Sequence, residues 1–340
     1  MFRAKIFKVN YHMGGRQEVD HLRLTLDQKK RQYRLIYESI YRNPRIFIKD
    51  IASILKIDRN TAAKRLQEAF EDGFVLIPQL RKLSFGNFKE YMYVFNSKNP
   101  LRAYLDYIEN QDVVYHAELL GSFNFWIVTR DEIDIGGSVI LEGPRSDYFV
   151  TYAPNQSWTT AIEKMHIMVE NFDIAEYNPR GIIKTRWNKT VGWDSEFELL
   201  YREFKYNVRQ KQTPLRKKYL ISGMKLEKWY KEFPEYCTVF TRYFPDGFSA
   251  YDPYLLIFET DYEDFLIDLF SELPTSSFFF KVADKLFLYA DVPRQYIRSI
   301  DLHASVNRLH IPLLVEDLLR RGIIKSHFRS IIEYSWGKDL

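Results

Sequence analysis

The sequence predicts an α+β protein built from two units in tandem, and three observations indicate this class. Amphipathic helix patterns and then alternating strand and helix patterns fill residues 27–190, and a similar order of elements returns in residues 191–340. The chain has 340 residues, which is enough for two to four ordinary domains. Hydrophobic residues make up 46% and charged residues 28%, and these values exclude a disordered or fibrous chain.

Cysteine content and hydropathy limit the classes of protein further. The chain has one cysteine, Cys237, which excludes a disulfide scaffold or a cysteine-rich zinc module and favours a reducing compartment. Cys237 lies in an apolar, aromatic run, so we expect a buried core residue. No apolar run approaches the ~20 residues of a membrane helix, and the start lacks the apolar core of a signal peptide. We therefore expect a cytoplasmic protein without a membrane partner.

The small net charge of +4 conceals an uneven distribution. Residues 1–90 contain 19 Lys plus Arg and 10 Asp plus Glu, a balance of +9. The remaining 250 residues then carry 30 and 35, a balance of −5. A basic N-terminal part on a slightly acidic body favours contact with a polyanion, although a solvated basic face without a partner would look the same.

Three short helices are predicted in the basic part of the chain. The periodicity predicts helices at 27–41, 48–56 and 59–72, the second with Ile48, Ile51, Ala52 and Leu55 along one face. Asp58 is a favourable N-cap for the third helix. We expect this helix to bury a stripe of residues: Ala62, Ala63, Leu66, Ala69 and Phe70.

A tight turn before the third helix and an extended ribbon at 74–82 complete the pattern of a winged helix-turn-helix. Such a unit places the start of its third helix in the major groove of double-stranded DNA. We expect base-edge or adjacent contacts from Arg59, Asn60, Thr61 and Lys64. We expect phosphate contacts from Lys49, Arg65, Arg81 and Lys82.

The stretch IKDIASILKIDRNTAAKRLQEAFEDGFVLIPQLRKLSFGNFKEYMYVF resembles the Lrp/AsnC family of prokaryotic transcription regulators. The similarity continues through NPLRAYLDY (99–107), VVYHAELL (113–120) and FNFWIVT (123–129). It implies a ferredoxin-like βαββαβ domain, often called RAM, that mediates dimerisation and can bind a small-molecule effector. The effector site would lie near Gly121, Phe123 and Asn124, where Asn124 replaces the acidic residue of the family. Residues 136–154 depart from the pattern and indicate two strands instead of a helix.

The second half of the chain repeats this order of elements without clear sequence identity. Three helix patterns at 194–210, 214–221 and 225–233 precede an extended segment at 236–244, and a βαββαβ pattern follows from 254 to 334. The third of these helices mixes acidic, basic and aromatic residues, so it could touch the DNA backbone or serve as a partner surface. One chain would then fold as a pseudo-dimer, with a homodimer of such chains left open.

The predicted domain boundaries follow from these patterns. We expect an N-terminal extension at 1–26, a winged helix-turn-helix domain at 27–84, a ferredoxin-like effector and dimerisation domain at 85–190, a second, diverged winged-helix domain at 191–250, and a second ferredoxin-like domain at 251–340.

The sequence has none of the common catalytic signatures. It contains no GxGxxG, Walker, HExxH or GxSxG motif, and no two histidines have helical metal-ligand spacing. We therefore expect a DNA-binding regulator that is not an enzyme and has no cofactor, catalytic residue or metal site.

Two alternatives stay open. Siroheme decarboxylases resemble Lrp/AsnC proteins in fold and have a histidine in their tetrapyrrole pocket. His116, on the predicted strand before Gly121, is consistent with such an enzyme. However, a strand histidine that faces a partner or solvent is the simpler interpretation, and the basic third helix has no use in a decarboxylase. A non-enzymatic interaction scaffold would suit the many aromatic residues, 26 Phe, 24 Tyr and 6 Trp.

Overall fold

The first three helices form a helix-turn-helix unit, which we call the first head. The computed structural model describes residues 24–136, 138–296 and 310–337. The helices of the first head are α1 (Leu26–Arg42), α2 (Ile48–Leu55) and α3 (Arg59–Glu71). Asp58 caps α3, as predicted, by accepting hydrogen bonds from the backbone N–H groups of Asn60 and Thr61, both at 2.9 Å. Ala62 is fully buried between the helices, whereas Ala63 is exposed, because it lies one residue beyond the buried stripe.

A second head with the same order of helices follows later in the chain. Its helices are α6 (Ser195–Phe204), α7 (Gln212–Tyr219) and α8 (Gly223–Tyr236). The turns before α3 and α8 correspond residue for residue, because Lys56 and Leu220 are both left-handed C-caps, with φ of 56° and 55°. The core of the second head forms around Trp229, which is fully buried.

Two reciprocal arginines hold the heads together. Arg45, after α1, donates to the carbonyl oxygen of Val208 in the second head. Arg209, after α6, donates to the carbonyl oxygens of Pro44 and Ile46 in the first head, both at 2.8 Å. Burial and then the charge of Arg45 lower the pKa of Arg209 to about 10. The two arginines occupy equivalent positions, so the contact has an approximate twofold character.

Each head is followed by one strand, and the two strands pair with each other. β1 (Gln79–Lys82) and β7 (Cys237–Phe240) form an antiparallel ladder in which Leu80 faces Val239. The sequence predicts a wing within each head, but the structure pairs the two extended segments between heads. A strand pairs its backbone groups with any available edge, and the nearest edge here belongs to the other head.

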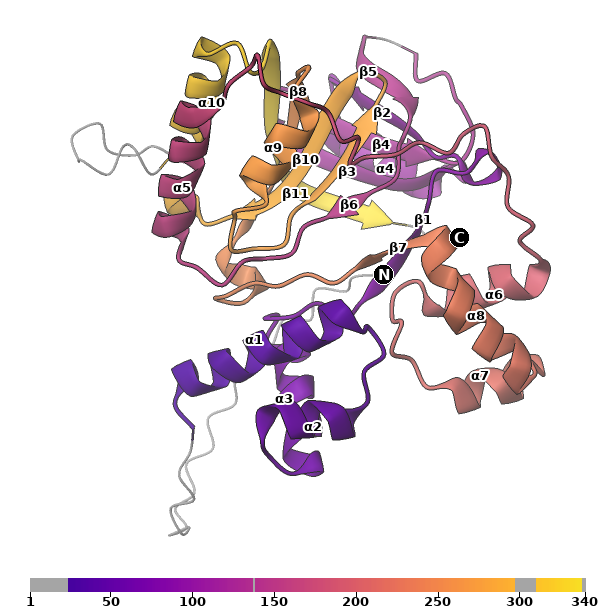
Figure 1. Ribbon diagram of the computed structural model, residues 1–340. Coiled ribbons are helices and arrows are strands. Elements are labelled where there is room, and N and C mark those ends of the chain that lie inside the picture. The colour runs from indigo at the N-terminus through magenta and orange to yellow at the C-terminus, as the bar shows by residue number, and fades with distance from the viewer. Residues whose placement is uncertain (1–23, 137, 297–309, 338–340) are drawn as a thin grey trace.

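The rest of the described structure is one curled sheet with helices packed on it (Figure 1). The first half of the chain supplies β2 (Tyr91–Phe95), β3 (Val113–Gly121), β4 (Phe125–Thr129), β5 (Val139–Pro144) and β6 (Phe149–Val150). The second half supplies β8 (Asp252–Glu259), β9 (Phe278–Val282), β10 (Lys285–Val292) and β11 (Ser326–Gly337). The strand order is β5-β2-β4-β3-β11-β8-β10-β9-β6, in which each half has the order of a βαββαβ unit.

Helices cover the outer face of the sheet unequally. α4 (Pro100–Glu109) covers the first half, and α9 (Glu263–Phe270) and α10 (Ile311–Arg320) cover the second. Among the described residues of the first half, no helix lies between β4 and β5. Instead α5 (Trp158–Asn171) follows β6 and packs beside α9 and α10 (Figure 1). Three single 3₁₀ turns complete the described elements: Gly86–Phe88, Phe248–Ala250 and Arg294–Tyr296.

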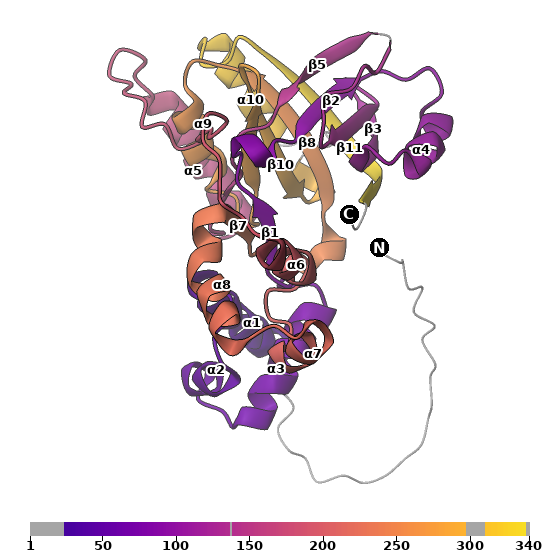
Figure 2. The ribbon, with the colours of Figure 1, turned by 90° about the vertical axis from the view of Figure 1, so that its right-hand side faces the viewer.

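The sheet curls until its two ends meet, and this curvature encloses an apolar core (Figure 2). Arg145, just after β5, forms an antiparallel bridge with Val282 of β9, and β6 pairs with β9. Inside the curl, Trp126 of the first half stacks on Phe280 of the second, with ring centroids 6.2 Å apart. The α+β class with two units, each a helix-turn-helix head followed by a ferredoxin-like half, is therefore confirmed. Among the described residues, no helix is both long and apolar enough to cross a membrane.

Candidate functional site

The central strand β11 carries an imidazole, His327, and a guanidinium, Arg329, on the face that α10 covers. β11 pairs with β8 on one side and with β3 on the other, so it joins the two halves of the sheet. Alternate residues of a strand point to opposite faces. His327, Arg329 and Ile331 therefore face α10, whereas Ile332, beyond them on the strand, packs in the core inside the curl.

A close approach of β3 to β11 forms one wall of a pocket. The backbone N–H of Ser122 donates to the carbonyl oxygen of Arg329 at 2.9 Å, and the Arg329 N–H donates to Ser122 Oγ at 3.2 Å. A Cβ at Gly121 would lie 2.4 Å from that same carbonyl oxygen, so only glycine fits here. Gly121 thus permits the contact that brings the end of β3 to the pocket.

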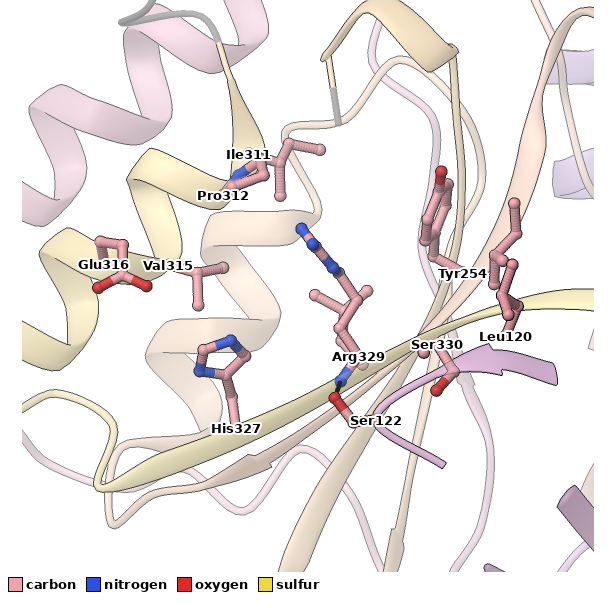
Figure 3. A pocket seen from close by; sticks show the side chains of 13 residues that line it. Leu120, Ser122, Tyr254, Ile311, Pro312, Val315, Glu316, His327, Arg329 and Ser330 are labelled. Atoms are coloured by element: carbon pink, nitrogen blue, oxygen red, sulfur yellow. Dashed lines mark hydrogen bonds between the residues drawn. The ribbon is translucent and has the colours of Figure 1, made fainter. Parts of the chain in front are cut away.

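The pocket has a volume of about 690 Å³ and lies between the sheet and the start of α10. This volume is within the range of ~300–1,000 Å³ that is usual for small-molecule sites. Figure 3 shows the Arg329 side chain extending from β11 toward Ile311, while His327 lies below Val315. Most of the lining is apolar: Leu120, Tyr254, Leu256, Ile311, Pro312, Val315 and Ile331.

The charged and titratable side chains that line the pocket are Arg329, His327 and Glu316. Within the described part of the chain, no side-chain or backbone acceptor lies within hydrogen-bond distance of the Arg329 guanidinium. Burial lowers the pKa of His327 below its ordinary value, the Glu316 carboxylate raises it and the charge of Arg329 lowers it further. The N-terminal end of α10, with its partial positive charge, lies at the same pocket.

This arrangement suits an anionic molecule with an apolar body. A guanidinium can bind a carboxylate through two parallel hydrogen bonds, and the apolar lining can cover the remainder of the molecule. The imidazole of His327, which lines the same pocket, is a group that can accept or donate a proton. Among the described residues, no three His, Cys, Asp or Glu side chains gather to hold a metal ion.

The three residues expected near an effector have different surroundings. Gly121 lines the pocket. Phe123 is fully buried inside the curled sheet, and its N–H donates to Ser330 Oγ at 3.1 Å. Asn124 fixes the turn after β2, because its side chain accepts from the Ser97 N–H at 2.7 Å and donates to the Ser97 carbonyl at 2.8 Å. Of the three, only Gly121 reaches the pocket.

The sequence reasoning missed His327 and Arg329, which dominate the pocket. The available signal was their alternation with Phe328 and Ser330 in a predicted strand, which places two cations on one half-buried face. One partner of that face, α10, directly precedes β11, but the other, the end of β3, comes from the first half of the chain. Periodicity alone could therefore not indicate that the two cations line a cavity.

Four of the predicted DNA-contact residues lie together on the exposed side of the first head. All four are exposed: Lys49, Arg59, Asn60 and Lys64. The three basic residues among them have no ion-pair partner within the described ranges. Lys49 and Arg59 line the same shallow cavity of about 320 Å³ at the start of α2 and α3. Thr61 lies beside them, half-buried, and its hydroxyl donates to Asp58.

The other three predicted contacts are engaged inside the molecule. Arg65 is buried and pairs with Glu68. Arg81, in the β1–β7 ladder, donates to the Leu80 carbonyl at 2.8 Å and to Gln79. Lys82 pairs with Glu198 at 2.6 Å and lies over the rings of three aromatic residues: Phe88, Trp193 and Tyr201. Contact of these three with phosphates would require their present partners to be released.

Two further residues were singled out in the sequence. His116 is fully buried under α4, with Tyr104 and Trp336 among its ring neighbours, so the expectation that it faces solvent or a partner is wrong. The aromatic residues of α4 and of the end of β11 close over it. Cys237 is buried, as predicted, and burial raises the pKa of its thiol.

Comparison with known proteins finds two solved structures that are similar to this chain. No protein-family model and no curated protein matches the chain. A crystal structure of the siroheme decarboxylase NirDL matches with a TM-score of 0.46 and 11% identity over 90% of this chain and 92% of that chain. A second structure, of NirDL in complex with an iron-uroporphyrin III analogue, matches with a TM-score of 0.39 and 13% identity over 86% of both chains.

These matches correct one expectation. The sequence analysis expected a protein that is not an enzyme, and this expectation is contradicted, because both matching structures are of an enzyme. The arrangement of heads and ferredoxin-like halves that the Lrp/AsnC resemblance implies is present, but a regulator role does not follow from it. Identities of 11% and 13% concern the fold alone, so the activity of this chain has to follow from its own residues.

Proposed function

We propose that this chain is an enzyme that binds and acts on a carboxylate-bearing, largely apolar molecule in the pocket between α10 and β11. The observation that carries the proposal is Arg329, a cation in a mainly apolar pocket without an acceptor among the described residues. Arg329 is half-buried, and a cation that is partly removed from water without a partner gains by receiving an anion. The pocket supplies the rest of the binding surface.

The two cationic side chains support decarboxylation as the reaction. In this reaction the C–C bond to the carboxylate breaks, CO₂ leaves, and the remaining carbon takes up one proton. Arg329 would orient the carboxylate, and the His327 imidazolium would supply the proton. Siroheme decarboxylase is the activity of the NirDL protein, and a tetrapyrrole with carboxylate side chains has the chemistry that this pocket favours. We therefore propose tetrapyrrole carboxylates as the first substrates to test.

Incubation with iron-uroporphyrin III and with siroheme, followed by mass spectrometry of the products, tests the proposal. We expect the mass of one tetrapyrrole to fall by whole CO₂ groups, and we expect Arg329→Gln to slow this loss at least 10-fold. Arg102→Gln is the matched control, because Arg102 is an exposed arginine on α4 with one weak partner, Asp106 at 3.8 Å. Equal rates in the wild type and in Arg329→Gln, or unaltered tetrapyrroles with both, would contradict the proposal.

A second candidate function is binding of duplex DNA by the first head. The observation that favours it is the group of exposed residues at the start of α3, in which Arg59, Asn60 and Lys64 lie beside Lys49 of α2. Arg and Asn side chains bind base edges in a major groove, and Lys binds phosphates. An enzyme can retain such a head, so the two functions do not exclude each other.

Gel-shift titrations at several salt concentrations test the second function. We expect binding of genomic fragments to weaken steeply with salt, and Arg59→Ala with Lys64→Ala to abolish it. Arg102→Ala with Lys231→Ala serves as the control, because both residues are exposed and lie outside α3. Absence of binding at low salt would exclude this function, and equal loss in the control pair would show that only total charge matters.

A further inference from the structure

The turn between α7 and α8 exposes two large apolar side chains, Leu220 and Met224, which we call the apolar tip. Their exposed fractions are 90% and 80%, higher than those of any other large apolar residue in the part of the chain that the structure describes. Figure 1 shows this turn on the side of the second head that faces away from the sheet. Exposed apolar side chains at one prominent turn are typical of a contact surface.

The segment that contains the apolar tip is rich in cations, and some of them are unpaired. Residues 211–226 contain five Lys or Arg and no Asp or Glu. Lys218 pairs with Glu203, and Lys225 with Asp194 and Glu196. The other three are exposed and have no carboxylate partner within the described ranges: Lys211, Arg216 and Lys217. The guanidinium of Arg216 lies about 3.6 Å from the Cβ position of Gly223, so it adjoins the start of α8.

The first head has different chemistry at the equivalent positions. Both turns contain a left-handed C-cap followed two residues later by the N-cap of the next helix, so the residues correspond directly. Lys56 is replaced by Leu220, and Asn60 is replaced by Met224. Leu and Met side chains cannot donate the hydrogen bonds that base edges require. The face of the second head is therefore unsuited to the role that α3 has in the first.

We propose that the apolar tip and the cations beside it dock an acidic segment of a partner protein. In this arrangement apolar side chains of the segment cover Leu220 and Met224, and its carboxylates pair with Arg216 and Lys217. A nucleic acid would neutralise the cations but would leave the apolar tip in water, because its backbone offers little apolar surface. An acidic segment with interspersed apolar residues satisfies both kinds of side chain.

Selection of random 16-residue peptides displayed on phage tests the proposal with the full-length chain as the target. We expect enriched peptides to combine Asp and Glu with Leu, Ile or Phe. Fluorescence anisotropy of labelled peptides should then give at least 10-fold weaker binding to Leu220→Asn with Met224→Gln. Asparagine tolerates the left-handed backbone of Leu220, so this variant retains the turn. Arg216→Gln with Lys217→Gln should also weaken binding and reduce its dependence on salt.

The matched control is Lys56→Asn with Asn60→Gln at the equivalent positions of the first head, which we expect to leave peptide binding unchanged. Failure to enrich acidic peptides, or equal binding to the Leu220 and Met224 variant, would overturn the proposal. Duplex DNA provides a further test. If Leu220→Asn with Met224→Gln weakens DNA binding as much as Arg216→Gln with Lys217→Gln does, the face binds nucleic acid and the proposal fails.

Discussion

At the scale of single residues, the pocket depends on side chains whose surroundings come from distant parts of the chain. His327 and Arg329 are two residues apart in β11, but Gly121, from the other half of the chain, and the start of α10 define the space they face. The resemblance to the Lrp/AsnC family predicted an effector site near Gly121. It did not indicate His327 or Arg329. Phe123 and Asn124 were predicted with Gly121, and both serve the fold instead.

His327 predicts a pH dependence of ligand binding. In the free protein, burial lowers the pKa of His327 below its ordinary value, the Glu316 carboxylate raises it in part, and the charge of Arg329 lowers it. A bound carboxylate favours the imidazolium and raises this pKa in the complex. Affinity should therefore increase as pH falls from 8 and level off below the pKa of the free protein. Calorimetric Kd values between pH 5 and 8 should become nearly constant in His327→Gln, and an unchanged slope in that variant would argue against this role.

Gly121→Ala should destabilise the junction of the two halves. The added Cβ would lie 2.4 Å from the Arg329 carbonyl oxygen and 2.7 Å from Ser330 Cα, and both are backbone atoms that cannot turn away. We expect the free energy of unfolding to fall by about 2–3 kcal/mol, as for other overpacked sites. Urea denaturation measures this, with Gly192→Ala as the control, since its Cβ would meet no atom within 4 Å. Equal stabilities of the two variants would mean that β3 can shift without cost.

At the scale of elements, the sequence predicted most helices and strands, because their periodicity is a local property. The helices at 48–55 and 59–71 lie within a residue of the predicted bounds. Two non-local features were missed. β1 and β7 pair between the heads, and α5 packs on the half of the sheet that follows it in sequence. Both depend on which edge or face remains open after folding, which no local pattern encodes.

The reciprocal arginines predict how firmly the heads are joined. Arg209→Ala removes two hydrogen bonds, to the carbonyl oxygens of Pro44 and Ile46, each worth about 1–2 kcal/mol. We expect faster amide hydrogen exchange in residues 43–47 and 205–211, with unchanged exchange in β8 and β10. Arg216→Ala is the control, because this arginine is exposed in the same head. Unchanged exchange in Arg209→Ala would mean that the β1–β7 ladder alone holds the heads.

At the scale of the whole molecule, the two halves of the chain form one continuous sheet through β3 and β11. The sequence predicted the duplication from the order of elements but could not predict that the halves enclose a common core. The pocket is a consequence of this union, because the first half supplies Leu120, Gly121 and Ser122 and the second half supplies the cations and α10. Neither half contains a complete site, so the proposed activity belongs to the fused chain.

The most direct test of the proposed activity is a crystal structure of the chain with a bound tetrapyrrole carboxylate such as iron-uroporphyrin III. We predict a carboxylate of the ligand within hydrogen-bond distance of the Arg329 guanidinium, with the apolar part of the ring against Leu256 and Val315. His327 should lie beside the same carboxylate. A ligand bound elsewhere on the molecule, or bound in this pocket with its carboxylates turned away from Arg329, would contradict the account.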